Sequence, residues 1–397
     1  MLVQANTILY FQSSLSAINV GELEGFRARA HDFGWHLQVI EYDGAAKSRF
    51  QTAGGDIVCI KELIGFWKAD GCVVECGGRP PRFSLAEFGK TPVVLLDCHP
   101  SDVGYRTPCV YRDEVIVGQC AAKELLSLQL EDYAYLPWLE PRLTWSRVRG
   151  GAFAACVTQN GKRHHVFVPE SSNVDVIRIR HGLCNWIRSL PRPCGVFASN
   201  DIMASLFLEA ARTGGDVVPR DFAVVGVDND DSICENGVVS LTSIELDVQR
   251  YGAIAAELLD RRMKRAGTQS CMSASGVYLH RRTSTRMVKV SDARIGRALE
   301  FIRKKACSGI SPPDVVAEMG CSRRLADLRF REATGRSILD EIHDVRIGKV
   351  KELLRRGNCS ESFIADSTGY SSLIDLCRVF KRLAGVTMSE YRRMCCR

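Results

Sequence analysis

Two segments near the C-terminal end share one pattern, and this repeat constrains the fold more than any other feature of the chain. The first reads SPPDVVAEMGCSRRLADLRFREATG and the second reads CSESFIADSTGYSSLIDLCRVFKRLAG. Each predicts a short helix, a turn at Gly320 or Gly369, and a second helix that ends in an aromatic and a basic residue. This pattern indicates a helix-turn-helix, in which the second helix enters a DNA major groove and the first helix braces it.

The helix predicted over Ile338–Leu354 would join the two motifs, so that they meet successive major grooves about one helical turn apart. From Val288 to Arg397 the sequence has 22 Lys and Arg against 14 Asp and Glu, a net charge of +8. The preceding part has 31 against 32, a net charge of −1. A basic block behind a near-neutral body is typical of a nucleic-acid-binding module attached to a second domain. Charge alone also fits a solvated basic helical domain.

The body of the chain, from Thr7 to about Arg265, alternates short apolar runs with segments of helical length. Most runs lack strict polar alternation, which indicates strands buried on both faces of a parallel sheet. The predicted strands are Thr7–Phe11, Leu37–Tyr42, Gly71–Glu75, Pro92–Asp97, Asp132–Leu136, His165–Val168, Gly195–Ala198 and Phe222–Val227. The predicted helices include Val20–Phe33, Val115–Leu128, Arg149–Gln159, Ile202–Thr213 and Asp247–Lys264. Repeated strand-helix-strand units predict a doubly wound α/β architecture.

Several protein classes are disfavoured by patterns that the sequence lacks. It contains no G-x-G-x-x-G opening a helix and no G-x-x-x-x-G-K-[ST] loop, which disfavours dinucleotide and nucleoside-triphosphate enzymes. The 17 cysteines are scattered and lack the paired spacing of zinc sites, so we expect reduced thiols, no metal and no cofactor. The start of the chain has no basic region before an apolar run, and no run approaches the roughly 18 apolar residues of a membrane span. We therefore expect a cytoplasmic protein without membrane contact.

The composition changes after Lys264, where small and polar residues follow from Ala266 to Gly276. A strand-like Val277–Leu279 and a basic stretch, His280–Arg286, come next. We interpret this region as the end of the α/β part and a linker. The predicted domains are residues 5–286, with the α/β pattern, and residues 287–397, which are all-helical.

The C-terminal domain resembles the AraC-type DNA-binding domain over both motifs, and DLCRVFKRLAGVTMSEYRR resembles the terminal signature of that family. The resemblance implies two recognition helices whose arginines can fork to guanine and whose apolar side chains can contact thymine methyl groups. The implied base contacts are Arg323, Arg324, Asp327 and Leu328 in the first helix and Ser372, Leu373, Ile374, Cys377 and Arg378 in the second. The implied phosphate contacts are Arg331, Lys381, Arg382 and Arg392, for which solvated surface charge is the alternative.

The first recognition helix departs from the family pattern at two positions. Ala326 stands at a core position that is usually leucine, and Leu328 stands where arginine is frequent. These departures leave the operator sequence open, but they do not affect the assignment of the module. Phe330, Phe380 and Tyr391 are interpreted as core residues rather than as residues that stack on bases.

The α/β part resembles the ligand domain of LacI-type repressors and periplasmic sugar-binding proteins. The segments VFASNDIMASLFLEAARTGGDVVPRDFAVVGVDNDD and LTSIELDVQRYG carry this resemblance, which runs from about Ala5 to Thr285. It implies two α/β lobes, each a doubly wound parallel sheet, with the ligand in the cleft between them. Together with the tail, the chain most resembles the XylR-like xylose regulators.

The resemblance also implies a sugar site, because each sugar hydroxyl is both a donor and an acceptor and needs both kinds of partner. Arg149 would donate to oxygens, Asn200 would do both, and Asp228 would accept from two hydroxyls. Asn200 and Asp228 directly follow predicted strands, where open α/β sheets bind ligands. Ser13 and Ser14 are weaker candidates. In the alternative, Asp228 caps a turn and Arg149 pairs on the surface. We expect Asp201 to cap the helix that begins at Ile202.

The partners implied are double-stranded operator DNA, a sugar effector such as xylose, and a second copy of the chain in a homodimer. Contact with RNA polymerase is compatible with such a regulator, which would control carbohydrate-use genes. An enzyme is one rival, but the acidic and histidine pairs lack a nucleophile or metal-ligand spacing. A DNA-repair enzyme fused to an AraC-type tail is a second, and Pro193-Cys194-Gly195 does not match its Pro-Cys-His-Arg setting. A pure sugar-binding protein is a third, and the tail disfavours it.

Overall fold

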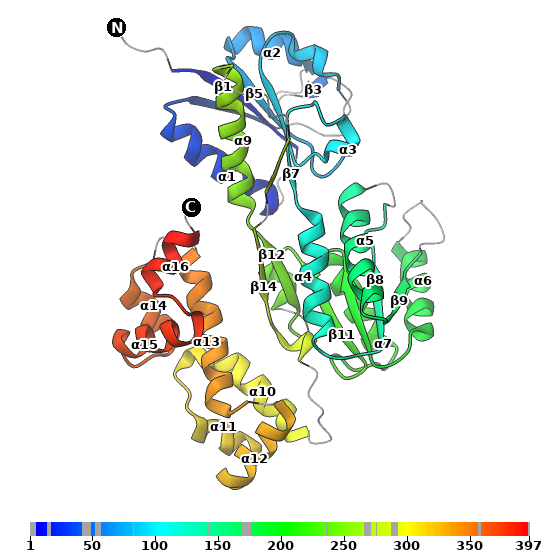
Figure 1. Ribbon diagram of the computed structural model, residues 1–397, viewed down its shortest axis with the longest axis vertical. Coiled ribbons are helices and arrows are strands. Elements are labelled where there is room, and N and C mark those ends of the chain that lie inside the picture. Colours follow the sequence, from blue (N-terminus) through cyan, green and yellow to red (C-terminus); the bar gives the residue numbers. More distant parts are fainter. Residues whose placement is uncertain are drawn as a thin grey trace. The chain divides into compact units, whose positions relative to one another are not determined.

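The structure is a computed structural model whose chain separates into two compact units, Met1–Arg286 and Met287–Arg397. We describe each unit by itself (Figure 1). The described residues are 5–13, 17–41, 49–51, 57–81, 83–140, 143–168, 176–235, 237, 239–265, 271–274, 276–286, 293–334, 336–355 and 359–395.

The first unit contains two lobes, each built on a six-stranded sheet. In lobe 1 the strand order is β13-β7-β6-β5-β1-β2, and every neighbouring pair is parallel. Its strands are β1 (Thr7–Gln12), β2 (His36–Glu41), β5 (Gly71–Glu75), β6 (Val93–Leu96), β7 (Cys109–Arg112) and β13 (Cys271–Ala274). A separate antiparallel pair is formed by β3 (Arg49–Gln51) and β4 (Ile57–Cys59). The helices of lobe 1 are α1 (Ala17–Asp32), α2 (Ile60–Trp67), η1 (Leu85–Phe88), α3 (Pro100–Val103) and α9 (Val248–Met263).

Lobe 2 has the strand order β14-β12-β11-β10-β8-β9, parallel except for the β12–β14 pair. Its strands are β8 (Asp132–Leu136), β9 (Arg163–Val166), β10 (Cys194–Ala198), β11 (Phe222–Val227), β12 (Thr242–Leu246) and β14 (Val277–His280). Its helices are α4 (Glu114–Leu126), α5 (Thr144–Gln159), α6 (Val176–Ser189), α7 (Asp201–Thr213), α8 (Asp231–Cys234) and η2 (Thr283–Thr285). The central strands β8, β10 and β11 are buried along their whole length, as their apolar runs predict.

The chain passes between the lobes three times. It leaves lobe 1 between β7 and α4, returns between β12 and α9, and leaves again between β13 and β14. Two of these crossings are bonded to each other, because the Asp113 N–H donates to the Ala274 carbonyl at 3.1 Å. The Asp247 N–H donates to the Gly276 carbonyl at 3.0 Å, and this bond joins the crossing between β12 and α9 to the crossing between β13 and β14. The lobes are therefore linked by a short, mutually bonded set of segments.

The region predicted as a linker is in fact part of both sheets. Residues 271–274 form β13, an edge strand of lobe 1, and β14 is an edge strand of lobe 2. The linker interpretation was wrong for residues 271–274, because β13 lacks the apolar run that marks a central strand and an edge position tolerates such a sequence. The strand expected at Val277–Leu279 is present as β14. The eight predicted strands are all present, whereas β3, β4, β7 and β12 were not predicted.

The end of the first unit is fixed to lobe 2 by side chains of η2. The Ser284 hydroxyl donates to the Val224 carbonyl at 2.6 Å and accepts from the Thr242 N–H at 2.8 Å. The Thr285 hydroxyl lies 3.2 Å from a carboxylate oxygen of Glu124 on α4, and both η2 residues are buried. The chain therefore leaves lobe 2 from a firmly held point.

The second unit is helical throughout its described part. Its helices are α10 (Ala293–Lys305), η3 (Ala306–Ser308), α11 (Pro312–Met319), α12 (Arg323–Thr334), α13 (Ile338–Arg355), α14 (Glu361–Ser367), α15 (Leu373–Ala384) and α16 (Met388–Cys395). One apolar core lies around α10, α11 and α12 and a second around α14, α15 and α16, and α13 contributes to both. Phe330 and Phe380 lie in these cores, as predicted, and Tyr391 packs against the second.

Candidate functional site

Arg149 lies at the junction of the lobes, on α5, and only 2% of it is exposed. Its Nε donates to the Glu114 carboxylate on α4, and its Nη1 donates to the Ser199 carbonyl at 2.6 Å. The guanidinium also lies 4.8 Å from the ring centroid of Trp145. A surface ion pair, the alternative reading of Arg149, is therefore wrong.

Asn200 follows β10 and caps the N-terminus of α7. Its side-chain oxygen accepts from the Met203 N–H at 3.0 Å, and the amide nitrogen of the side chain remains as a donor that has no hydrogen-bond partner among the described residues. The expectation that Asp201 caps this helix is wrong. Asp201 is buried and accepts from the Ser243 hydroxyl at 2.6 Å and from the Asp230 N–H at 2.9 Å. It thereby holds the loop after β11.

Asp228 is the first residue of that loop and has a φ of 103°, a conformation that non-glycine residues rarely adopt. Burial raises the pKa of the Asp228 carboxyl to about 7, although the nearby positive charge of Arg149 acts in the opposite direction. The negative charge of Asp228 in turn helps to raise the pKa of Arg149 against the effect of burial. The two predicted residues are thus brought into electrostatic contact. The N-cap of α8 in this loop is Asp230.

Ser13 follows β1 in lobe 1, and its N–H donates to the Glu75 carboxylate at 3.2 Å. Ser14 lies outside the described residues. Gly77 is close to Ser13, because a Cβ at Gly77 would lie 3.5 Å from the Ser13 hydroxyl oxygen. The structure therefore places Ser13 at the carboxyl ends of the lobe 1 strands, beside Glu75.

A buried charged network in lobe 1 was not predicted. One guanidinium nitrogen of Arg112 donates to Glu22 at 2.8 Å and to Asp97 at 2.9 Å, and Tyr10 donates to Glu75. Burial raises the pKa of Glu22 to about 8 and that of Glu75 to about 7. The sequence signal that could have revealed the network is positional, because Glu75, Asp97 and Arg112 each end or follow a lobe 1 strand.

Several buried polar atoms near these strand ends have no hydrogen-bond partner among the described residues. They are Nε2 of Gln12, which ends β1, Oγ of Ser199, which follows β10, Oδ1 of Asn229 and Nε of Arg112. A buried polar group without a partner is costly, so such groups indicate a place where a polar ligand or water belongs. Together with Arg149, Asn200 and Asp228 they supply both donors and acceptors, which a polyhydroxylated ligand needs.

The two lobes contact each other beside this site. The Thr144 hydroxyl donates to Asp102 at 2.8 Å, and Arg79 pairs with Glu140 at 3.1 Å. Gly78 has a φ of +72°, and a Cβ there would lie 2.6 Å from Cδ1 of Trp145. Because any larger residue would collide with the indole, the loop after β5 can meet α5 only with glycine at this position.

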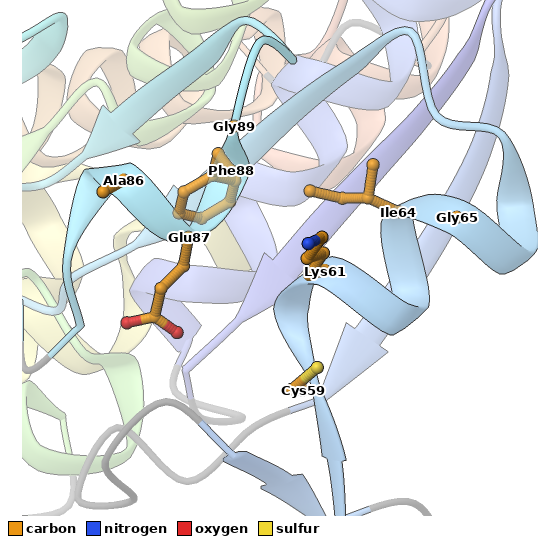
Figure 2. A pocket seen from close by; sticks show the side chains of 8 residues that line it. All are labelled: Cys59, Lys61, Ile64, Gly65, Ala86, Glu87, Phe88 and Gly89. Carbon is orange, nitrogen blue, oxygen red and sulfur yellow. The ribbon is translucent and has the colours of Figure 1, made fainter.

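A pocket of about 530 Å³ lies elsewhere in lobe 1, between α2 and η1. Figure 2 shows Lys61 and Ile64 of α2 facing Glu87 and Phe88 of η1 across it. Its other lining residues are Cys59, Gly65, Ala86 and Gly89. None of the predicted ligand-binding residues lines this pocket.

The second unit places the predicted base contacts on α12 and α15, the second helices of the two motifs. Most are exposed: Arg323, Arg324, Asp327, Leu328, Ser372, Ile374, Cys377 and Arg378. Ile374 is 82% exposed, which is unusual for an isoleucine. Leu373 differs, because it is half-buried against the second core. The first motif presents Leu328 with 55% exposure, while Ala326 is fully buried at the core position.

Some predicted DNA contacts already have partners within the protein. The Ser372 hydroxyl accepts from the Asp375 N–H at 3.2 Å as the N-cap of α15, and Arg378 pairs with Asp375 at 2.6 Å. Arg331, Lys381 and Arg382 are exposed. Arg392 is half-buried and donates to the Cys359 carbonyl at 2.7 Å, just before α14. This contact supports the start of α14, a role that the phosphate assignment did not include.

The two motifs are tied to each other by side chains of α13. The Arg346 guanidinium donates to the Ala306 carbonyl at 2.9 Å and to the Ile310 carbonyl at 2.8 Å, and it lies 5.3 Å from the Tyr370 ring centroid. His343 stacks on the same ring, 5.9 Å away. These contacts fix the turn before α15 against the turn before α11. The spacing of the two recognition helices is therefore set by the protein itself.

Neither a metal-binding cluster nor a membrane-spanning helix is found among the described residues. Among these residues, no group of three or more His, Cys, Asp or Glu side chains is arranged to hold a metal ion. No helix in the described ranges is long and apolar enough to cross a membrane.

Two family profiles match the chain. A periplasmic binding protein-like domain matches residues 122–285, and a helix-turn-helix domain matches residues 315–394. The xylose operon regulatory protein of Haemophilus influenzae is 26% identical over 293 residues, covering 72% of this chain and 75% of that protein. The protein of the same name from Escherichia coli K12 is 29% identical over 250 residues, covering 62% of this chain and 64% of its own length.

Solved structures with the same fold include one described as the xylose-binding transcription activator xylR. It has a TM-score of 0.61 and 22% identity, and the match covers 99% of both chains. A complex of the regulator CelR with cellobiose has a TM-score of 0.53 and 18% identity, covering 70% of this chain and 84% of that one. The fold therefore consists of two periplasmic-binding-protein-like α/β lobes and a helix-turn-helix domain.

Proposed function

Because this chain is a XylR-like DNA-binding transcription regulator, we propose that residues 5–286 bind a sugar, with xylose the first candidate, and that residues 287–397 read an operator. Binding of the sugar would change operator affinity and so control carbohydrate-use genes. The single observation that carries the proposal is the placement of Arg149. It is buried at the lobe junction, bonded to Glu114 and Ser199, and in electrostatic contact with Asp228.

This arrangement suits a neutral polyol better than an anion or an apolar molecule. Arg149 and the amide nitrogen of Asn200 supply donors, while Asp228 and Glu114 supply acceptors. The carboxyl groups of Glu22, Glu75 and Asp97 lie on the lobe 1 side, and burial raises the pKa of each. Near neutral pH such carboxyl groups can donate as well as accept hydrogen bonds, and they offset the charges of Arg112 and Arg149. Hydroxyl groups would therefore find both kinds of partner, whereas an anion would find no excess of positive charge. The relatives named for the xylose operon support xylose as the first sugar to test.

The proposal extends to partners and setting. A second copy of the chain is the expected partner, because two copies present two pairs of recognition helices to an operator, and the fold also occurs in a lac repressor dimer. RNA polymerase is a further partner if the regulator activates. We place the protein in the cytoplasm with its operator. We assign it no catalytic activity, since the groups brought together are suited to holding hydroxyls, and recovery of the sugar unchanged after prolonged incubation would check this.

Thermal-shift measurements on the full chain with aldopentoses and aldohexoses test the sugar assignment. A cognate sugar at a hundredfold excess over Kd should stabilise the first unit by about 2.7 kcal/mol. Fluorescence anisotropy of a double-stranded operator should then show an affinity that changes with that sugar and not with its epimers. If no sugar shifts the melting temperature while the operator still binds, the sensing assignment is wrong and the DNA-reading assignment stands.

The domain division is tested by expressing residues 287–397 alone. This fragment should show a helical circular dichroism spectrum and should bind the operator without any response to sugar. A disordered spectrum would contradict the division, and so would sugar-dependent binding by the fragment.

A further inference from the structure

Cys109 and Cys271 face each other at the outer edge of the lobe 1 sheet. They lie on β7 and β13, which pair in parallel with Cys109 directly opposite Cys271. Their sulfur atoms are 3.5 Å apart. Neighbouring strands lie about 4.7 to 4.9 Å apart, which is within the roughly 4.4 to 6.8 Å between Cα atoms that a disulfide spans. A small rotation of the side chains would therefore bring the sulfurs to bonding distance.

Exposure distinguishes the two thiols. Cys109 is fully buried, and burial raises the pKa of its thiol. Cys271 is partly exposed, and its sulfur lies 3.1 Å from the Tyr105 carbonyl and 3.4 Å from the Thr107 carbonyl. Two further thiols of this sheet, Cys76 and Cys98, interact with each other but are both buried. Cys271 is therefore the member of this group that a reagent in solution meets first.

We propose that Cys109 and Cys271 form a redox modification site, at which a hydroperoxide converts the two thiols into a reversible disulfide. The Cys271 thiolate attacks one peroxide oxygen, the O–O bond breaks, and water or an alcohol leaves, so that Cys271 becomes a sulfenic acid. The Cys109 sulfur then attacks the Cys271 sulfur, the S–O bond breaks, and hydroxide leaves with the Cys109 proton as water. The two thiols lose two electrons and the peroxide gains them.

The position of β13 gives this bond a structural consequence. β13 is a four-residue strand at the edge of the sheet, and among the described strands it pairs with β7 alone. Both strands lead directly into crossings to lobe 2, and the Asp113 N–H to Ala274 carbonyl bond joins them at that point. A disulfide would join the two strands three residues before that bond on β13 and four residues before it on β7. Local opening of β13, and with it of the third crossing, would become much rarer in the oxidised protein.

Differential alkylation and peptide mapping of the full chain test the proposal. Reduced protein is treated with a small excess of hydrogen peroxide, remaining thiols are blocked with N-ethylmaleimide, and the digest is analysed by mass spectrometry. We expect one intramolecular disulfide that joins the Cys109 and Cys271 peptides and disappears with dithiothreitol. In hydrogen-exchange measurements, the amides of residues 271–274 should exchange at least about tenfold more slowly after oxidation, because opening of this edge is restricted.

The matched variants are Cys271→Ser, which should abolish the disulfide, and Cys184→Ser, which replaces a partly exposed cysteine of α6 and should leave it intact. Three results would overturn the proposal: oxidation of Cys271 to a sulfinic acid without a disulfide, a disulfide between other cysteines, or persistence of the product in Cys271→Ser. The mapping of the unmodified sequence needs no variant. It decides the question even if a substitution prevents folding.

Discussion

Replacing Asp228 by asparagine should stabilise the ligand-free protein while weakening its hold on the sugar. Burial places the pKa of Asp228 near 7, against an ordinary value of 3.8. Because the folded-state pKa is raised, the stability linked to this group is fully present below the unfolded pKa and is lost as the pH rises towards the folded pKa. Above this pKa the Asp228 side chain is ionised in a partly desolvated position, which lowers the free energy of unfolding. Asparagine has nearly the same shape and carries no charge, so it removes this penalty.

The size of the effect follows from the shift. Three pKa units at about 1.36 kcal/mol each give a ceiling of about 4 kcal/mol. Since the side chain is only half-buried, we expect Asp228→Asn to gain about 2 to 3 kcal/mol at pH 8 and almost nothing at pH 4. Loss of the carboxylate acceptor should weaken sugar binding at least tenfold, or about 1.4 kcal/mol.

Urea unfolding followed by tryptophan fluorescence measures the stability, and all five tryptophans lie before residue 287. The two proteins are compared at pH 4, 5, 6, 7 and 8, and calorimetry gives the sugar affinity. Asp221→Asn is the control, because hydrogen bonds from Arg220 lower the pKa of Asp221. For this control the stability change has the opposite sign. Asp221→Asn should be less stable than the unmodified protein at pH 7, and the difference between the two proteins should vanish as the pH falls. A stability difference for Asp228→Asn that is the same at pH 5 and pH 8 would refute the reasoning.

Three further predictions concern the lobe contact and the DNA-reading unit. Arg324→Ala and Arg378→Ala should each lower the binding free energy for the operator by about 1 to 3 kcal/mol and that for a scrambled duplex by much less. Lys381→Ala should weaken binding to the two duplexes equally and reduce the slope of log binding constant against log salt concentration by about one unit. Fluorescence anisotropy at several salt concentrations distinguishes the two outcomes. Gly78→Ala should lower stability by about 1 to 3 kcal/mol through its collision with Trp145, and unchanged unfolding and sugar affinity would contradict that packing. Arg346→Met should take the guanidinium donor from the Ile310 carbonyl, while the Ala306 carbonyl keeps the Gly309 N–H, so stability should fall by about 1 to 3 kcal/mol and operator affinity should fall with it. Lys349→Met on the same helix should change stability by less than about 0.5 kcal/mol.

The parts of the fold that the sequence revealed are those with strong local patterns. Apolar runs marked the central strands β5, β10 and β11, because a strand buried on both faces has few polar residues. Gly320 marked the turn after the first helix of the motif, and it indeed caps the C-terminus of α11 in the left-handed conformation. Edge strand β13 was missed since Cys271–Ala274 has no such run, and its pairing with β7 joins residues 162 positions apart.

The candidate site shows the same limit. Arg149, Asn200 and Asp228 could be named because they occupy positions of a family pattern, and the structure brings them to one end of the lobe 2 sheet. The partners that hold them could not be named. Glu114 begins a helix and would ordinarily be read as a solvated acidic residue of a first turn, yet it pairs with buried Arg149. Glu22 lies within α1, and only the three-dimensional packing places it against Arg112.

Helix α4 runs from the proposed sugar site to the point where the chain leaves the first unit. Glu114 in its first turn holds Arg149, while Glu124, ten residues later, contacts Thr285 and Arg281. At about 1.5 Å per residue these two carboxylates are carried roughly 15 Å apart on one rigid rod. A displacement of α4 by a ligand at one end would pull on the exit of the chain at the other. The first unit would in this way signal to the helix-turn-helix unit through the covalent connection alone, and no contact between the surfaces of the two units would be required.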